Sequence, residues 1–167
     1  GRHNVGNAVA AAACCHAAGI APGIIVAGLQ AARPCRGRLQ SRAGAQGSLV
    51  IDDSYNANPA SVQMAIDTLL ACDGKKILVL GDMGELGPDA ASMHAETGRY
   101  AKQAGIETLL VTGELSRATA AAFGDGARHF DSWQALADAC LAMADKHTVI
   151  LVKGSRSAGM DRIADAL

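Results

Sequence analysis

Polar side chains are concentrated at residues 52–58, which read DDSYNAN and directly follow an apolar run. This segment supplies carboxylate, hydroxyl and amide groups, all of which form hydrogen bonds to ligands. Two structural roles explain part of this polarity. Asn58 is placed to cap a helix that begins at Pro59, and one aspartate is placed to accept bonds from turn amides. More polar groups are present than these roles require, so we interpret the segment as part of a binding site.

A second polar segment, KGSRS at residues 153–157, also follows an apolar run. Lys153 is expected at the end of a strand, partly sheltered from solvent. Gly154 and Ser155 are expected to present backbone amides at the start of the last helix. A lysine beside the positive end of a helix would form an anion site. The alternative is a solvated loop lysine without a ligand.

A third segment, GDMGELG at residues 81–87, places acidic side chains among glycines. This composition predicts a flexible, negatively charged loop that is unsuited to binding phosphate, and the segment lacks the context of a dinucleotide-binding fingerprint. His94 follows on an expected helix. It is a candidate general base, although a histidine on a helix face more commonly packs, or bonds Glu96 or a nearby loop.

Apolar runs alternate with helical segments along most of the chain, which indicates βαβ units and a parallel sheet. The runs are rich in Val, Ile and Leu without polar alternation, as expected for strands covered on both faces. Strands are predicted at 49–52, 76–81, 108–113, 127–130 and 148–154, and helices near 59–72, 89–104, 115–123, 133–145 and 158–167.

In such a sheet, every loop that follows a strand leaves at the same edge, and ligands bind there. We expect one rim to collect the charged residues of these loops, namely Asp53, Asp82, Glu85, Lys153 and Arg156. The segments GRLQSR and SLVID flank the turn AGAQG, which predicts a β-hairpin with an antiparallel edge strand. The predicted fold is a Rossmann-like, doubly wound α/β domain at 36–167 with a mostly parallel six-stranded sheet.

Two helices are predicted before this domain. An alanine-rich run predicts a helix that begins near Asn4, the expected N-cap, and stops at Gly19. A second helix is expected from Pro22 until Pro34 ends it. We interpret residues 1–35 as a helical pair from another domain, and the chain as a piece excised from a longer protein.

Composition excludes several classes of function. Lys and Arg number 15 against 16 Asp and Glu, for a net charge of -1. No basic stretch is interleaved with aromatic residues, so we expect no nucleic-acid partner. No apolar run approaches the ~20 residues that span a bilayer, and the N-terminus lacks a secretory signal. We therefore expect a cytoplasmic protein without a membrane segment.

Common catalytic and metal-binding motifs are also absent from the sequence. The five cysteines lack CxxC spacing and are expected to be free thiols. The histidines form no constellation with cysteine or carboxylate at metal spacing, so no metal ligand is assigned. The sequence contains neither GxxxxGK[ST] nor GxSxG, so it supplies no complete catalytic apparatus by itself.

Several segments together resemble the C-terminal part of the Mur ligases, over nearly the whole chain. The resemblance is carried, in order, by GRHNVGNAVAAAA at the start, GRL at 37–39, DDSYNANPAS at 52–61, LGDMGELG at 80–87 followed by His94, and LVKGSRS at 151–157. Enzymes of this family have three domains. The resemblance implies that residues 1–35 are the last helices of the central ATPase domain and that 36–167 are the C-terminal Rossmann-like domain.

The resemblance implies an ATP- and Mg²⁺-dependent ligase of peptidoglycan precursor synthesis. Such an enzyme joins D-Ala-D-Ala to UDP-N-acetylmuramoyl-tripeptide through an acyl phosphate. The full-length protein is expected to be a monomer. This piece alone is expected to be inactive, because the P-loop and the Mg²⁺ ligands would lie in the absent part. The alternatives are a stand-alone Rossmann-type module that binds a nucleotide or a protein, and a sister ligase of the Mur or folylpolyglutamate type.

The resemblance also implies roles for individual residues at the nucleotide. Asn4 and Asn7 are similar to a pair that lies beside the adenine, one helical turn apart. Arg38 is similar to the arginine that meets the nucleotide phosphate across a domain interface, a task suited to guanidinium. Asp53 matches the aspartate that binds the ribose hydroxyls of ATP.

For the acceptor dipeptide the resemblance is less exact. Lys153, Ser155 and Arg156 are the candidates for binding its carboxylate, because of the anion site expected at KGSRS. Asp82 or Glu85 is the candidate for binding its ammonium group.

Overall fold

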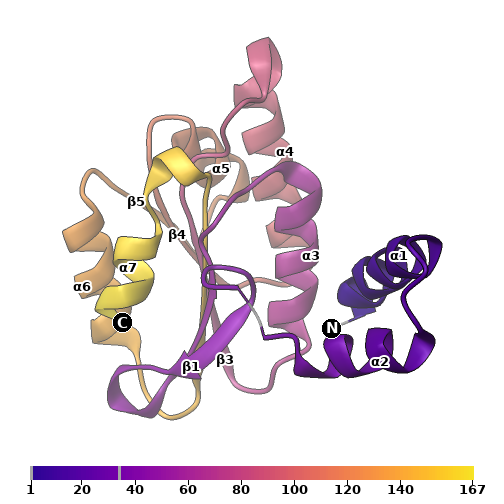
Figure 1. Cartoon of the computed structure of the whole chain (residues 1–167). Coiled ribbons are helices and arrows are strands. Elements are labelled where there is room, and N and C mark those ends of the chain that lie inside the picture. Colours follow the sequence, from indigo (N-terminus) through magenta and orange to yellow (C-terminus); the bar gives the residue numbers. More distant parts are fainter. Residues whose placement is uncertain (1, 34) are drawn as a thin grey trace. The chain divides into compact units, whose positions relative to one another are not determined.

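The computed structural model describes residues 2–33 and 35–167, with side chains from Val5 onward. It divides into two compact units, one within residues 1–34 and the other at Cys35–Leu167 (Figure 1).

The first unit is a pair of helices, α1 (Arg2–Ala17) and α2 (Pro22–Ala31), which contact each other (Figure 1). The predicted pair is therefore present. Because α1 begins at Arg2, Asn4 lies inside the helix and is not its N-cap. Gly19 follows α1 with φ of +80°, the left-handed conformation that ends helices. No residue of α2 is buried within the described part of the chain.

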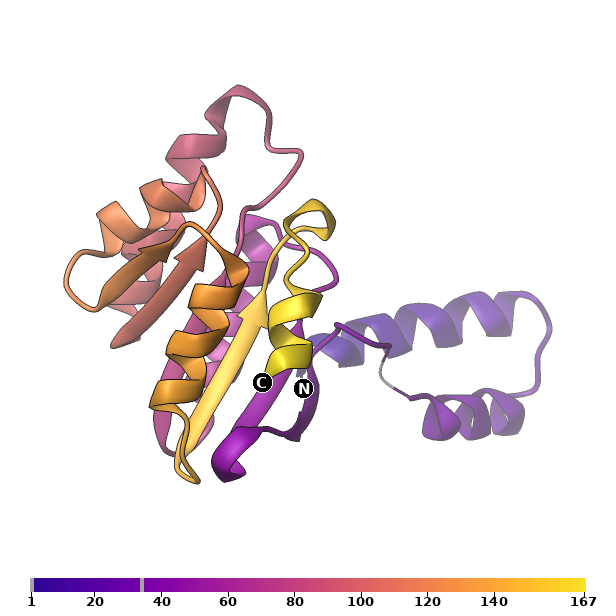
Figure 2. The ribbon, with the colours of Figure 1, turned by 90° about the vertical axis from the view of Figure 1, so that its left-hand side faces the viewer.

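The second unit contains a six-stranded sheet with the order β1-β2-β6-β3-β4-β5 (Figure 2). Strand β1 pairs antiparallel with β2, and the other pairings are parallel. The predicted sheet, including its antiparallel edge strand, is confirmed. The strands are β1 (Gln40–Ala43), β2 (Leu49–Asp53), β3 (Lys75–Leu80), β4 (Thr108–Thr112), β5 (Ala127–Phe130) and β6 (Thr148–Lys153).

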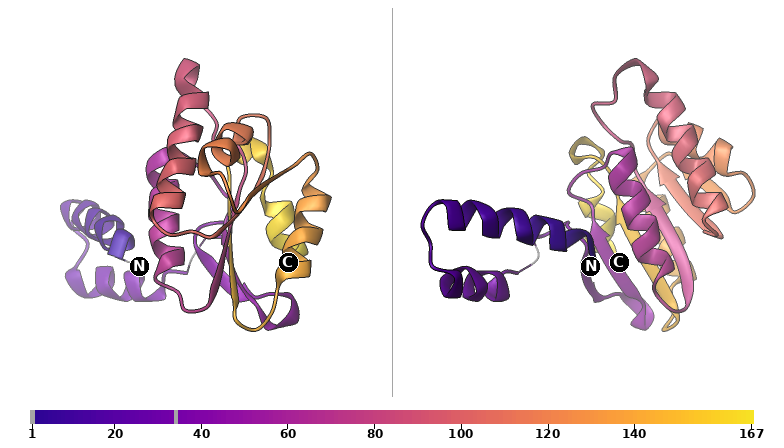
Figure 3. Two further views of the ribbon diagram at one scale, coloured as in Figure 1. Left: turned by 180° about the vertical axis from the view of Figure 1, so that it is seen from behind. Right: turned by 90° about the vertical axis from the view of Figure 1, so that its right-hand side faces the viewer.

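Helices cover both faces of this sheet (Figures 1 and 3). On one face lie α3 (Pro59–Leu70), α4 (Ala90–Gln103) and α5 (Ser116–Phe123). On the other lie α6 (Trp133–Met143) and α7 (Asp161–Ala166). Successive strand residues alternate between the two cores, so that Leu78 packs on the first face and Ile77 and Val79 on the second. Burial on both faces explains why the strands carry unbroken apolar runs.

The end of the chain differs from the prediction. A helix was expected from residue 158, but α7 begins at Asp161 and is preceded by a 3-10 turn, η3 (Arg156–Ala158). Gly159 separates the two because its φ of +61° is left-handed and interrupts the helix. Gly154 and Ser155 therefore do not open the last helix.

Candidate functional site

The register of the parallel strands brings the three polar segments together at one edge of the sheet. Asp53, the last residue of β2, pairs with Lys153, the last residue of β6. Lys153 also pairs with Leu80, the last residue of β3. Residues 52–58 (the Asp53 loop), 81–87 (the Asp82 loop) and 153–157 (the KGSRS segment) therefore leave neighbouring strands at the same edge, as predicted (Figure 2).

The Asp53 loop and the KGSRS segment are joined by a buried ion pair. Lys153 Nζ lies 2.6 Å from Asp53 Oδ2 and also donates to the carbonyl of Asn56 at 2.8 Å. Lys153 is only 2% exposed. The other carboxylate oxygen, Asp53 Oδ1, accepts a bond from the backbone N–H of Leu39 at 3.1 Å. Burial of an ammonium group is tolerated only with such partners, so Lys153 fixes the loop to the sheet.

The KGSRS segment does not form the anion site that the sequence predicts. The expected anion site needed a lysine beside the first amides of a helix, but Lys153 is paired with Asp53. The N–H of Ser155 donates to the carbonyl of Asp82 at 2.8 Å. The prediction of an anion site at the start of the last helix is therefore wrong. Asp53 and Lys153, which were assigned to different ligands, contact each other.

The carboxylate of Asp82 is bonded to the start of helix α5. Oδ1 accepts bonds from the N–H of Ser116 at 2.8 Å and from its hydroxyl at 2.6 Å, and Oδ2 accepts from the N–H of Leu115 at 3.3 Å. The first N–H groups of a helix have no partner within the helix. Asp82 satisfies them from a loop 33 residues earlier in the chain.

His94 supports the Asp82 loop. Its Nε2 accepts a bond from the N–H of Met83 at 3.0 Å, so Nδ1 carries the proton and donates to the carbonyl of Ala90 at 2.8 Å. The imidazole is only 1% exposed. Of the two interpretations of His94, the bond to a nearby loop is confirmed.

Local bonds account for two further residues of the Asp53 loop. Asn58 caps α3 in a reciprocal capping box with Ser61, as predicted. Asp52 Oδ1 accepts from the N–H of Ser54 at 3.1 Å, the expected bond to a turn amide.

Tyr55 received no role from the sequence, yet two arginines from distant segments lie against its ring. The guanidinium carbon of Arg38 is 4.3 Å from the ring centroid, and that of Arg156 is 5.6 Å away. These distances fall within the range of cation–π attraction. A single aromatic residue after a strand gives no sequence signal for such a contact, because the partners come from segments far away in the chain.

Three of the five acceptor candidates share one pocket. This pocket, called the Arg156 pocket, has a volume of about 790 Å³ and includes Glu85, Ser155 and Arg156 in its lining. Its other lining residues are Tyr55, Asn56, Ala57, Asn58, Gly84, Leu86 and Ser157. It therefore places a carboxylate and a guanidinium on the walls of one cavity.

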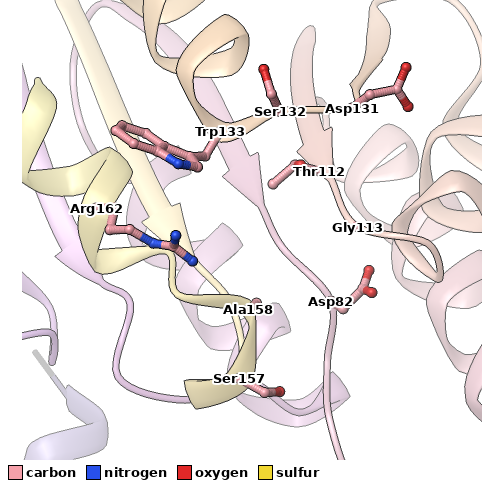
Figure 4. Close-up of a pocket in the computed structure, with 9 residues that line it drawn as sticks. All are labelled: Asp82, Thr112, Gly113, Asp131, Ser132, Trp133, Ser157, Ala158 and Arg162. Carbon is pink, nitrogen blue, oxygen red and sulfur yellow. The ribbon is translucent and has the colours of Figure 1, made fainter.

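Asp82 lines a different pocket, the Arg162 pocket, with a volume of about 420 Å³ (Figure 4). Arg162 lies over the ring of Trp133 at 5.9 Å. Figure 4 shows the carboxylate of Asp82 on the side of the pocket away from this pair. The two acidic candidates for the ammonium group thus belong to separate cavities.

The adenine prediction stays a prediction. Asn7 lies in α1, in the other compact unit, and the side chain of Asn4 lies outside the described residues.

Within residues 2–33 and 35–167, no group of three or more His, Cys, Asp or Glu side chains could hold a metal ion. Over the same residues, the helices are too short or too polar to cross a bilayer.

Comparison with known proteins gives the family. Residues 37–156 match the family described as "Mur ligase, glutamate ligase domain". The whole chain is 40% identical to the UDP-N-acetylmuramoyl-tripeptide--D-alanyl-D-alanine ligase of Escherichia coli, and it spans 37% of the length of that relative.

Solved structures agree with this match. A crystal structure of MurF from Acinetobacter baumannii superimposes with a TM-score of 0.89 at 33% identity, over 99% of this chain and 38% of that one. MurF from Thermotoga maritima, solved in complex with ADP, gives a TM-score of 0.77 at 24% identity, over 92% of this chain and 35% of that one, and shows the same fold. The chain belongs to the Mur ligase family.

Proposed function

We propose that this chain is the C-terminal part of a ligase that joins D-Ala-D-Ala to UDP-N-acetylmuramoyl-tripeptide. The observation that carries the proposal is 40% identity, over the whole chain, to the Escherichia coli ligase named for that reaction. Under this proposal, residues 1–35 are the last helices of a central ATPase domain. Residues 36–167 form the domain that binds the acceptor dipeptide and brings it to the acyl phosphate.

The reaction needs an activated acyl group and a positioned amine. A carboxylate acylates poorly, and its phosphorylation by ATP provides a leaving group that the amine of the dipeptide displaces. This chain would hold that amine near the acyl phosphate and exclude water. Mg²⁺ would neutralise phosphate charge when bound. Because the described residues contain no group that fits a metal ion, its ligands are assigned to the preceding domain.

The Arg156 pocket fits a dipeptide zwitterion. D-Ala-D-Ala carries an ammonium group at one end and a carboxylate at the other, and this pocket offers Glu85 for the first and Arg156 with Ser155 for the second. Glu85 suits the ammonium group better than Asp82 does, because Glu85 lines the same pocket as Arg156, whereas Asp82 lines the Arg162 pocket and its carboxylate accepts three bonds from the start of α5. Lys153 would act through Asp53 and not on the dipeptide itself.

The nucleotide would lie beside the Asp53 loop. Asp53 keeps a 14% exposed side chain, and a carboxylate that accepts two bonds retains lone pairs for ribose hydroxyls. Arg38 is exposed and would meet a phosphate, while Asn4 and Asn7 would lie beside the adenine.

Phosphate release by the full-length protein tests the proposal. With ATP, Mg²⁺ and the UDP-muramoyl tripeptide present, D-Ala-D-Ala should stimulate turnover, whereas single amino acids, including glutamate, should not. Stimulation by glutamate with a folate substrate would assign the chain to a sister ligase. ATP-independent binding of a protein partner without turnover would favour a stand-alone module. The present chain by itself should hydrolyse no ATP.

A further inference from the structure

Tyr55 is the largest exposed side chain of the Asp53 loop, and none of the proposed roles uses it. It is 44% exposed, although the neighbouring strand residues are buried. An exposed aromatic ring beside a ligand pocket requires an explanation, and the surrounding contacts supply one.

The backbone places Arg38 beside this ring. The N–H of Tyr55 donates to the carbonyl of Gly37 at 2.9 Å, and the N–H of Leu39 donates to Asp53 Oδ1 at 3.1 Å. These two bonds hold residues 37–39 along the Asp53 loop. Gly37 has φ of +72°, and a Cβ there would lie 3.0 Å from the backbone nitrogen of Tyr55. Glycine therefore permits the close approach that brings Arg38 to the ring.

Arg156 reaches the same ring from the KGSRS segment. Its guanidinium carbon lies 5.6 Å from the centroid, compared with 4.3 Å for Arg38. Arg156 and Tyr55 line both the Arg156 pocket and a smaller pocket of about 300 Å³ beside Arg36. Two guanidinium groups at one ring repel each other, and an anion bound beside them would relieve that repulsion.

We propose that Tyr55 is a positioning residue that holds Arg38 and Arg156 in place on one aromatic ring. The proposal rests on the proposed function, in which Arg38 meets the nucleotide phosphate and Arg156 meets the carboxylate of the dipeptide. The ring then couples the two halves of the site. Its π face performs this task, so the hydroxyl group is dispensable.

Kinetics of the full-length ligase test this role with a matched pair of variants. Tyr55→Leu removes the ring, whereas Tyr55→Phe keeps it and removes only the hydroxyl. We expect Tyr55→Leu to raise the KM for ATP and the KM for D-Ala-D-Ala by about two- to five-fold each, with a smaller change in kcat. Tyr55→Phe should stay within about two-fold of the wild type on both.

A second readout needs no catalysis. In the present chain, NMR should show the side-chain protons of Arg38 and Arg156 shifted upfield by the aromatic ring. Tyr55→Leu should abolish both shifts and change the thermal midpoint only slightly, because the residue is partly exposed. Tyr55→Phe should preserve both shifts.

Unchanged KM values in Tyr55→Leu would overturn the proposal. Equal increases of KM in Tyr55→Leu and Tyr55→Phe would also overturn it, because they would assign the effect to the hydroxyl group. If the wild-type ligase shows no turnover dependent on D-Ala-D-Ala, the proposed function fails instead. In that case the NMR shifts still test whether Arg38 and Arg156 contact the Tyr55 ring. Loss of the shifts in Tyr55→Leu would support this contact, and their absence from the wild type would refute it.

Discussion

The Asp53 and Asp82 loops begin alike and use their carboxylates differently. Each loop follows a buried parallel strand, presents an aspartate at the same edge of the sheet, and precedes a helix. In the Asp53 loop, Asn58 caps the following helix from within the loop. The Asp82 carboxylate instead bonds the start of α5, whose own N-cap residue, Leu115, has no side-chain cap bond. Asp53 therefore has no capping role and pairs with Lys153, whereas Asp82 caps the start of α5.

This difference shows that the residue type alone does not predict what an aspartate at this edge bonds to. In these two loops, the aspartate caps a helix that has no side-chain cap of its own, and pairs with a lysine where the following helix is capped by Asn58. Substitutions in the two loops should therefore differ in how much, and in which part of the structure, they destabilise the protein.

The largest loss of stability is expected from Lys153→Met. This variant removes the cation from a carboxylate whose side chain is only 14% exposed, which costs about 3–5 kcal/mol of unfolding free energy. Urea unfolding of the present chain measures it, with Lys146→Met as the control because Lys146 is exposed. The double variant Asp53→Asn, Lys153→Met should recover part of the loss. A single variant as stable as the control would show that the ion pair does not support the loop.

A smaller loss is expected from Asp82→Ala. Removal of the carboxylate leaves the first N–H groups of α5 without an acceptor and should cost about 1–2 kcal/mol. The matched control is Asp131→Ala, since the side chain of Asp131 is 84% exposed and forms surface ion pairs with Arg117 and His129. That control should cost less than about 1 kcal/mol. Equal losses in both variants would contradict the capping role of Asp82.

The smallest loss is expected from Asn58→Ala, which removes a cap supplied by the loop itself. The expected cost is about 1 kcal/mol, with α3 fraying at its first turn. Hydrogen exchange should show faster exchange of the Ser61 amide, which donates to Asn58 at 2.8 Å. The Ser116 amide at the start of α5 provides the internal control. If the Ser61 amide keeps its protection in this variant, the cap from Asn58 does not stabilise the start of α3, and the stated difference between the two loops is wrong.

Much of the fold could be predicted from the sequence, because the strands are continuous apolar runs separated by strong helix and turn signals. The edge hairpin and the cap at Asn58 were predicted for the same reason. The start of α7 was not, because the left-handed conformation of Gly159 interrupts a segment whose sequence still suits a helix.

The site was predictable only as a collection of residues. Sheet topology indicated that Asp53, Asp82 and Lys153 would share one rim. Their mutual contacts depend on side-chain packing, which a single sequence does not encode locally. The pairing of Lys153 with Asp53 joins residues 100 positions apart, and the approach of Arg38 and Arg156 to Tyr55 joins three separate segments.

We propose that the acceptor dipeptide binds in the Arg156 pocket and not in the Arg162 pocket. The direct test compares Arg156→Leu with the matched variant Arg162→Leu in the full-length ligase, with D-Ala-D-Ala as the varied substrate. Loss of a charged hydrogen bond should raise the KM for D-Ala-D-Ala by about 10- to 100-fold in Arg156→Leu. Arg162→Leu should leave this KM nearly unchanged. The reverse order of effects would contradict the claim and move the acceptor to the Arg162 pocket.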